Sequence, residues 1–214
     1  MKRIAADYIY TLDGNEPLLD GFVEYDDDGT VVSTGVSRDV SSEENYIKGA
    51  IVPGFVNAHC HIELSYMWKL FRKGTGMAGF IDQINSLRDT CAQEKKEEDI
   101  RHWMKVLWDR GVSAMCDISN CADSFAIKRS SPMYTRTFLE VFGTEPEDCE
   151  RVMRSVRDLS SKAASFGLDA APTPHACYTM SPELLTESSR EGLLSGFLSY
   201  HSEETQEEEE MLKY

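Results

Sequence analysis

The segment Ile51-Val52-Pro53-Gly54-Phe55-Val56-Asn57-Ala58-His59-Cys60-His61 is an apolar run that ends in a His-x-His pair. Alternate side chains of a β-strand share a face, so His59 and His61 point one way while Cys60 points the other. Imidazole is a preferred ligand of Zn²⁺ and related ions, and one such ion makes water a nucleophile at neutral pH. The run therefore predicts a strand that ends in half of a metal site. A chance His-x-His pair is the alternative.

The residues before this run predict a small β-domain or a part of one. Three short segments are rich in β-branched and aromatic residues, and turn-forming Asp, Gly and Asn separate them. The expected strands cover residues 4–10, 21–25 and 31–35. We assign residues 1–50 to this domain and residues 51–214 to a second one.

The residues after the run predict helices that alternate with strands. Ser181 followed by Pro182 is a typical helix start. Apolar residues at helical spacing favour helices over residues 77–90, 97–110, 149–166 and 182–191. Buried strands are expected over residues 112–118, 133–142, 168–174 and 196–200. With the strand that carries His59 this makes five strands, and their helical crossovers imply an α/β fold with a parallel sheet.

Four of the five histidines follow predicted strands, at the end where parallel α/β proteins gather their active sites. His59, His61 and His201 are expected to be neutral ligands of one divalent ion. Glu204 lies close enough in sequence to exchange a proton with water held there. His175 is expected across the pocket, as a hydrogen-bonding residue for substrate.

Each of these residues also has a simpler interpretation. His175 or His201 alone could cap a helix or satisfy a buried carbonyl, and residues 203–210 could form a solvated helix face. Cys116 and Cys121 lack the second pair of ligands that a zinc knuckle needs. One shared site nevertheless explains four coincidences at strand ends, which favours the metal site.

The composition excludes several classes of partner. The formal net charge is −15, which argues against nucleic acid and anionic membranes. No apolar stretch approaches the roughly 20 residues that span a bilayer, and the first residues lack the apolar segment of a secretory signal. We expect a cytoplasmic protein with reduced cysteines that acts on a small molecule.

Three parts of the sequence resemble one known family. Residues 52–61, VPGFVNAHCH, look like the first-strand signature of the amidohydrolase superfamily. The patterns Pro174-His175-x-x-Tyr178-x-x-Ser181 and His201-x-x-Glu204-Thr205-x-x-Glu208 resemble its cytosine deaminase and chlorohydrolase (TRZ/ATZ) branch. Within that branch, HIELS at residues 61–65 is similar to the aminodeoxyfutalosine deaminases, as are DISN at 117–120 and EVFG at 140–143.

The resemblance implies a (β/α)₈ TIM-type barrel, of which this chain holds about the first five β/α units, and part of a small β-sandwich. It implies one Zn²⁺ or Fe²⁺ ion held by His59, His61, His201 and an eighth-strand aspartate. Glu204 would be the general acid/base, with His175 and Glu63 at the substrate. The implied reaction is hydrolytic deamination of an aminopurine nucleoside of the adenosine or aminodeoxyfutalosine type. Hydrolysis of another C–N or C–Cl bond, or metal binding without turnover, are the alternatives.

The sequence ends at Tyr214, before the sixth-strand histidine and the eighth-strand aspartate of that family. A parallel sheet of five strands leaves both of its edges without a partner. We therefore expect either an N-terminal portion of a longer protein or a chain that self-associates through its sheet edges, as a homo-oligomer.

Overall fold

The computed structural model describes residues 1–88 and 90–213, which form two compact units, Met1–Gly54 and Phe55–Tyr214. The first unit is one four-stranded sheet in the order β3-β2-β1-β4. Its strands are β1 (Lys2–Ile9), β2 (Leu18–Tyr25), β3 (Val31–Val36) and β4 (Tyr46–Ile51). The strands β1, β2 and β3 form antiparallel pairs, as their short connections require, and β4 runs parallel to β1. The three strands predicted from the sequence are present, and β4 is an addition.

The apolar run 51–61 forms two strands instead of one. Strand β4 ends at Ile51, and β5 (Phe55–Cys60) begins after Val52-Pro53-Gly54. Pro53 has no amide hydrogen for a sheet ladder, and glycine weakens a strand interior, so the run is interrupted there. The compact units divide at Gly54, a few residues beyond the boundary expected from the sequence.

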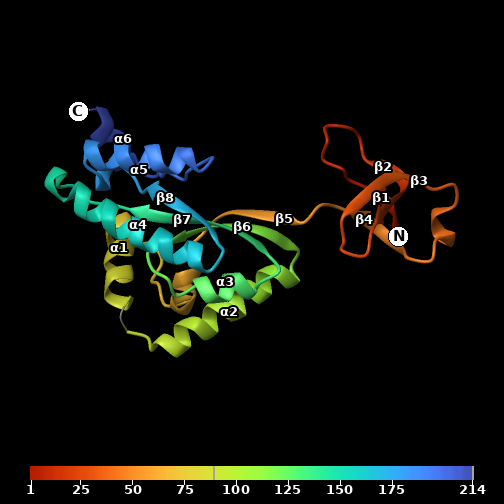
Figure 1. Cartoon of the computed structure of the whole chain (residues 1–214), viewed down its shortest axis with the longest axis horizontal. Helices are drawn as coiled ribbons and strands as arrows, with labels where there is room; N and C mark the ends of the chain where they lie inside the picture. Colours follow the sequence, from red (N-terminus) through yellow and green to blue (C-terminus); the bar gives the residue numbers. More distant parts are fainter. Residues whose placement is uncertain (89, 214) are drawn as a thin grey trace. The chain divides into compact units, whose positions relative to one another are not determined.

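The second unit is an α/β structure with a parallel sheet in the order β5-β6-β7-β8 (Figure 1). Sequential strands are neighbours, which is the result of β-α-β crossovers, and this confirms the expected fold class. The other strands are β6 (Val112–Ser119), β7 (Tyr134–Val141) and β8 (Asp169–Pro174). The helices are α1 (Gly76–Leu87), α2 (Gln93–Asp109), α3 (Phe125–Ser130), α4 (Cys149–Ser165), α5 (Pro182–Leu194) and α6 (Gln206–Lys213). Short 3₁₀ helices cover Val40–Ser42, Ile62–Met67, Pro146–Asp148 and Cys177–Thr179.

The prediction of a fifth strand over residues 196–200 is wrong. Only His201, just beyond it, makes an isolated bridge, to Ala176. The hydroxyl of Thr173 binds both the carbonyl and the amide of Ser199, so a side chain stands in for ladder bonds. The cause lies in β8, where Pro172 and Pro174 have no amide hydrogen. In a parallel strand, the backbone groups of alternate residues bond the same neighbouring strand. The amide of His175 bonds the carbonyl of Val141 in β7. The backbone of Pro172 and Pro174 is therefore directed to the other side, where the predicted fifth strand would pair.

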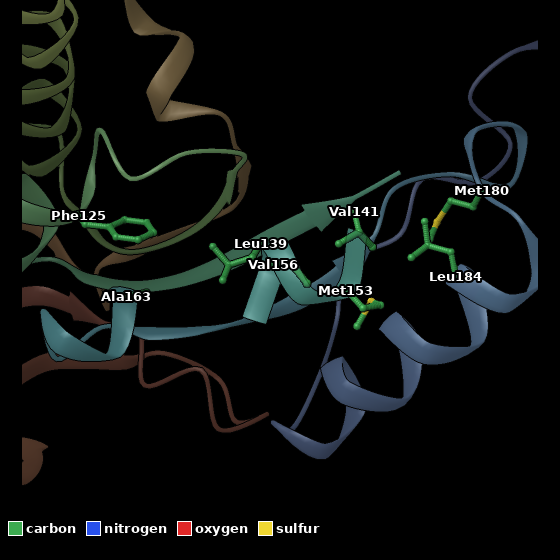
Figure 2. Close-up of a cluster of buried hydrophobic side chains, with 8 residues drawn as sticks. All are labelled: Phe125, Leu139, Val141, Met153, Val156, Ala163, Met180 and Leu184. Atoms are coloured by element: carbon green, nitrogen blue, oxygen red, sulfur yellow. The ribbon is translucent and has the colours of Figure 1, made fainter. Parts of the chain in front are cut away.

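Two apolar clusters fill the space between the sheet and its helices. The first joins β7, α3, α4 and the start of α5, and Figure 2 shows Met153 beside Val141, and Leu184 beside Met180. The second lies between β6, α2 and the residues after β5. Each fully buried Leu, Ile, Phe or Met contributes about 1.5–3 kcal/mol through removal of apolar surface from water. The helix start expected at Ser181 is confirmed, because its hydroxyl accepts the amide of Leu184.

On the face of the sheet opposite these clusters, the side chains of β7 and β8 change in character along the strands. Arg136 pairs with Asp169 at the amino-terminal end, and Phe138 lies opposite Ala171 in the middle. Glu140 ends the row on β7, at the carboxyl-terminal edge of the sheet. Since alternate residues share a face, the next residue of the β8 row is His175. The polar end of this face is therefore the edge at which the candidate site forms.

Candidate metal centre

Three histidines from distant parts of the chain meet at the carboxyl-terminal edge of the sheet. His59 lies in β5, His61 follows that strand, and His201 follows α5. One ring nitrogen of each lies within 4.8 Å of the others. The ring centroid of His59 lies 5.1 Å from that of His61 and 4.9 Å from that of His201. Three imidazoles that converge in this way suit a catalytic zinc site, so the residues present fit the expected ion.

The surroundings of His59 and His61 favour the form of the ring that binds a cation. Burial lowers the pKa of His59, and the neighbouring His201 lowers it further. Burial also lowers the pKa of His61. A lowered pKa favours the neutral ring, whose lone pair is available to a metal.

Glu204 lies beside the three histidines but does not belong to their group of candidate metal ligands. Its Oε1 atom is 3.5 Å from Nδ1 of His201, and its Oε2 atom accepts a hydrogen bond of 2.6 Å from the hydroxyl of Tyr178. Burial, and then this bond, raise the pKa of Tyr178, so the phenol is a neutral donor. The carboxylate thus lies next to one of the three histidines, and its role as a proton carrier stays a prediction.

His175 lies beside His201 and Glu140. Nε2 of His175 is 3.8 Å from Oε1 of Glu140, and its ring centroid is 5.2 Å from that of His201. The hydroxyl of Thr179 donates to the carbonyl of Ala176, so it accepts from Nδ1 of His175, at 2.8 Å. This arrangement assigns the proton to Nδ1 in the neutral ring and leaves Nε2 for a donor group of a substrate.

Glu140 was not among the residues singled out from the sequence. It forms a second group of possible ligands with His175 and His201, and it accepts a hydrogen bond of 3.2 Å from Nδ2 of Asn120. Its position at the end of β7 was a usable signal, because His61 and His175 also lie at the ends of parallel strands.

Glu63 is buried under the loop that follows β6. Its Oε2 atom accepts hydrogen bonds from the amides of Asn120 and Cys121, at 2.9 Å and 3.3 Å. Burial raises the pKa of Glu63, and the amide of Asn120 opposes that rise. These contacts give Glu63 a role in fixing the loop, and its role at the substrate stays a prediction.

A buried ion pair supports the His59–His61 end of the site and was missed from the sequence. Asp117 and Lys128 are fully buried and lie 2.6 Å apart. The other oxygen of Asp117 accepts the amide of Ile62 at 2.7 Å, directly after His61. Lys128 also donates to the hydroxyls of Ser119 and Thr137. A carboxylate inside an otherwise buried strand was the available signal.

The remaining candidates lie outside the centre. His102 packs against the ring of Trp103, with 5.2 Å between centroids, and Cys60 lies against the second apolar cluster, where burial raises its pKa to about 12. Within residues 1–88 and 90–213, Cys116 and Cys121 join no group of possible metal ligands. In the same part of the chain, no helix is long and apolar enough to cross a membrane.

Comparison with known proteins identifies a family and a fold. The sequence model of the Amidohydrolase family matches residues 50–210, whereas a search of curated protein sequences gives no match. Among solved structures, the chain is similar to aminofutalosine deaminase of Helicobacter pylori in complex with methylthio-coformycin, with 21% identity and a TM-score of 0.74. That match covers 94% of this chain and 50% of the deaminase.

Two further structures extend the likeness. An adenosine deaminase from Xanthomonas campestris with bound zinc is 14% identical, with a TM-score of 0.74, and covers 99% of this chain and 52% of its own. Atrazine chlorohydrolase TrzN from Arthrobacter aurescens, complexed with zinc, is 16% identical, with a TM-score of 0.66, and covers 89% and 50%. At these identities the likeness shows a shared fold. The chain spans about half the length of each of these proteins.

Proposed function

Because the chain belongs to the amidohydrolase family, we propose that it carries the metal-binding half of a hydrolase active site. The observation that supports this most directly is the convergence of His59, His61 and His201 beside the carboxylate of Glu204. Zn²⁺ suits three imidazoles, and Fe²⁺ is the second candidate. When bound, such an ion lowers the pKa of a coordinated water towards about 7.

The side chains of this chain transfer the proton and hold the substrate. Glu204 takes a proton from the attacking water at Oε1 and returns it to the leaving amine, since Oε2 is already bound to Tyr178. His175 accepts a hydrogen bond from the substrate through Nε2, and Glu140 orients an N–H or O–H group beside it. Glu63 holds the loop after β6, whose Asn120 donates to Glu140.

The substrate that we propose is an aminopurine nucleoside, which loses its exocyclic amine as ammonia. The names of two structural neighbours, an aminofutalosine deaminase and an adenosine deaminase, support this choice. Hydrolysis of another C–N bond or of a C–Cl bond on the same scaffold is the second candidate, because the chain also resembles an atrazine chlorohydrolase. Metal binding without turnover is the third.

The test combines metal analysis with product release. The zinc-reconstituted chain is incubated with adenosine, with 5′-methylthioadenosine and with atrazine, and ammonia and chloride are measured. Deamination requires one zinc per chain and ammonia release that falls about 10²- to 10⁴-fold in Glu204→Gln. Chloride release favours the second candidate, and stoichiometric zinc without either product favours the third. Zinc binding that survives replacement of all three histidines would overturn the site itself.

The partners expected from the sequence are proposals too: a small-molecule substrate, no nucleic acid or membrane, and self-association through a sheet edge. The exposed apolar side chains of Phe55 and Val56 support the last of these, since β5 is an edge strand and these residues are 60% and 64% exposed. Sedimentation of the purified chain tests it. Val56→Lys is expected to shift an oligomer towards monomer, and a wild-type chain that is monomeric at high concentration would contradict it.

A further inference from the structure

Glu204 is held at two points that its proposed chemistry does not require. Its Oε2 atom accepts the hydroxyl of Tyr178 at 2.6 Å, and its backbone amide donates to Oε2 of Glu208 at 2.7 Å. The preceding residue, Glu203, has a left-handed backbone with φ of 60°, which is uncommon for a residue with a side chain. The turn between His201 and Glu204 is therefore fixed by specific contacts and not by local preference.

Glu208 is itself fixed, although it belongs to an acidic run that suggested a solvated helix face. It is 4% exposed, its amide donates to the hydroxyl of Thr205, and its Oε1 atom accepts the thiol of Cys177. This is a variant of the capping box, in which the carboxylate reaches one residue further back, to Glu204. The amide of Glu204 is also the main cause that lowers the pKa of Glu208.

Both supports of Glu204 connect to the loop that carries His175. Tyr178 and Cys177 lie in the 3₁₀ helix Cys177–Thr179, directly after His175. The carbonyl of His175 accepts the amide of His201 at 2.8 Å. The loop after β8 thus sets the positions of the substrate-contacting histidine, of one metal ligand and of the proton carrier relative to one another.

We propose that Tyr178 and Glu208 are positioning residues for Glu204, a role that rests on the proposed function of that carboxylate. Tyr178 occupies Oε2 and so leaves Oε1 facing His201, 3.5 Å away. Glu208 holds the backbone from which this side chain extends. Without either contact the partly exposed carboxylate can rotate towards water, and a small displacement of a reacting group is costly.

The variants Tyr178→Phe and Glu208→Ala test the proposal in the zinc-loaded full chain with the nucleoside that gives the highest ammonia release. Each is expected to lower kcat about tenfold with KM and zinc affinity within about twofold of wild type, because both residues bind Glu204 and neither belongs to the candidate metal ligands. Glu208→Gln retains an oxygen acceptor and is expected to recover most of the kcat lost in Glu208→Ala.

Two matched controls remove the same chemical groups elsewhere. Tyr134→Phe deletes a hydroxyl that binds Asp169 at the other end of the sheet, and Glu209→Gln deletes a carboxylate of α6 that pairs with Lys213. Both are expected to keep wild-type kcat. In the Glu204→Gln background, Tyr178→Phe is expected to have no further effect, since it acts through Glu204. An equal loss in both backgrounds, or a raised KM with unchanged kcat, would overturn the role of Tyr178.

A measurement without turnover separates this proposal from the proposed function. Amide hydrogen exchange of Glu204, followed by NMR in the zinc-loaded chain, is expected to accelerate at least about tenfold in Glu208→Ala and to stay unchanged in Glu209→Gln. If the wild-type chain deaminates no nucleoside, the proposed reaction fails while this exchange still decides whether Glu208 holds Glu204. Unchanged exchange in Glu208→Ala would overturn the role of Glu208.

Discussion

The end of β5 and the segment that follows α5 bring residues to the same centre, but different interactions hold them. Behind His61, the fully buried pair Asp117–Lys128 fixes the next amide of the chain. Behind His201, the carboxylate of Glu204 accepts a hydrogen bond from Tyr178, and its backbone amide donates one to Glu208. A buried charge network is coupled to folding, because loss of one member leaves a charge without a partner. The bond between the partly exposed side chains of Tyr178 and Glu204 involves no buried ion pair, so its removal should cost the fold less.

The largest effect is expected from Lys128→Met, which removes the cation of the buried ion pair on the β5 side. The change leaves Asp117 buried without its cation and should lower the free energy of unfolding by about 3–5 kcal/mol. Urea denaturation of the metal-free chain measures it. The control is Lys105→Met, whose exposed partner is Asp109, with an expected loss below about 1 kcal/mol. Equal losses of unfolding free energy in the two variants would show that the buried pair stabilises the fold no more than an exposed pair does.

Removal of one ligand from each region should have the same effect on zinc. At a zinc concentration about 100-fold above the dissociation constant, binding stabilises the wild-type chain by about 2.7 kcal/mol. His61→Ala and His201→Ala are both expected to abolish that increment, and His102→Ala to retain it, since His102 lies away from the centre. Thermal unfolding with and without zinc measures the difference. If His201→Ala kept the full increment, the site would lie within the β5 side alone.

The two regions should also respond to pH with opposite signs. Burial raises the pKa of Glu63 above its ordinary value of 4.5, so the folded chain binds this proton more readily than the unfolded chain. Stability from Glu63 is therefore lost as pH rises through the raised pKa. The pKa of Glu208 is lowered by the amide of Glu204, so its contribution is present above 4.5 and is lost as pH falls through the lowered pKa.

Urea unfolding of the metal-free chain between about pH 3 and pH 8 tests these signs. Glu63→Gln is expected to flatten the decline of stability towards neutral pH, and Glu208→Gln to flatten the decline in acid. Both effects should be smaller than that of Lys128→Met, because each substitution retains an oxygen that accepts the same amides. The same slope change in both variants would contradict the assignment.

The sequence was most informative where local rules apply. Alternation along a strand placed His59 and His61 on one face, and the helix start at Ser181 followed from cap chemistry. The position of His175 followed from the rule that parallel strands present their carboxyl ends together, whereas the strand expected before His201 is not formed. These rules need only the residues within one element and its end.

The features that the sequence analysis missed depend on contacts between distant elements. The pairing of Asp117 with Lys128 and the place of Glu140 beside His175 both require the packed sheet. The apolar residues at 196–200 suggested a strand, but the prolines of β8 deny it a ladder. The capping role of Glu208 was within reach, since Thr205-x-x-Glu208 is a capping pattern, although its neighbouring glutamates suggested a solvated face.

The prolines of β8 have one more consequence, for the way in which copies of this chain can add to one another. Pro172 and Pro174 remove amide donors from the outer side of β8, and Thr173 already binds the backbone of Ser199 there. The β5 edge has no such block. Within the parallel sheet β5-β6-β7-β8, as far as the structure describes it, two copies that join through β5 use up the open edge, so growth by this route ends at a pair and does not continue into a fibril.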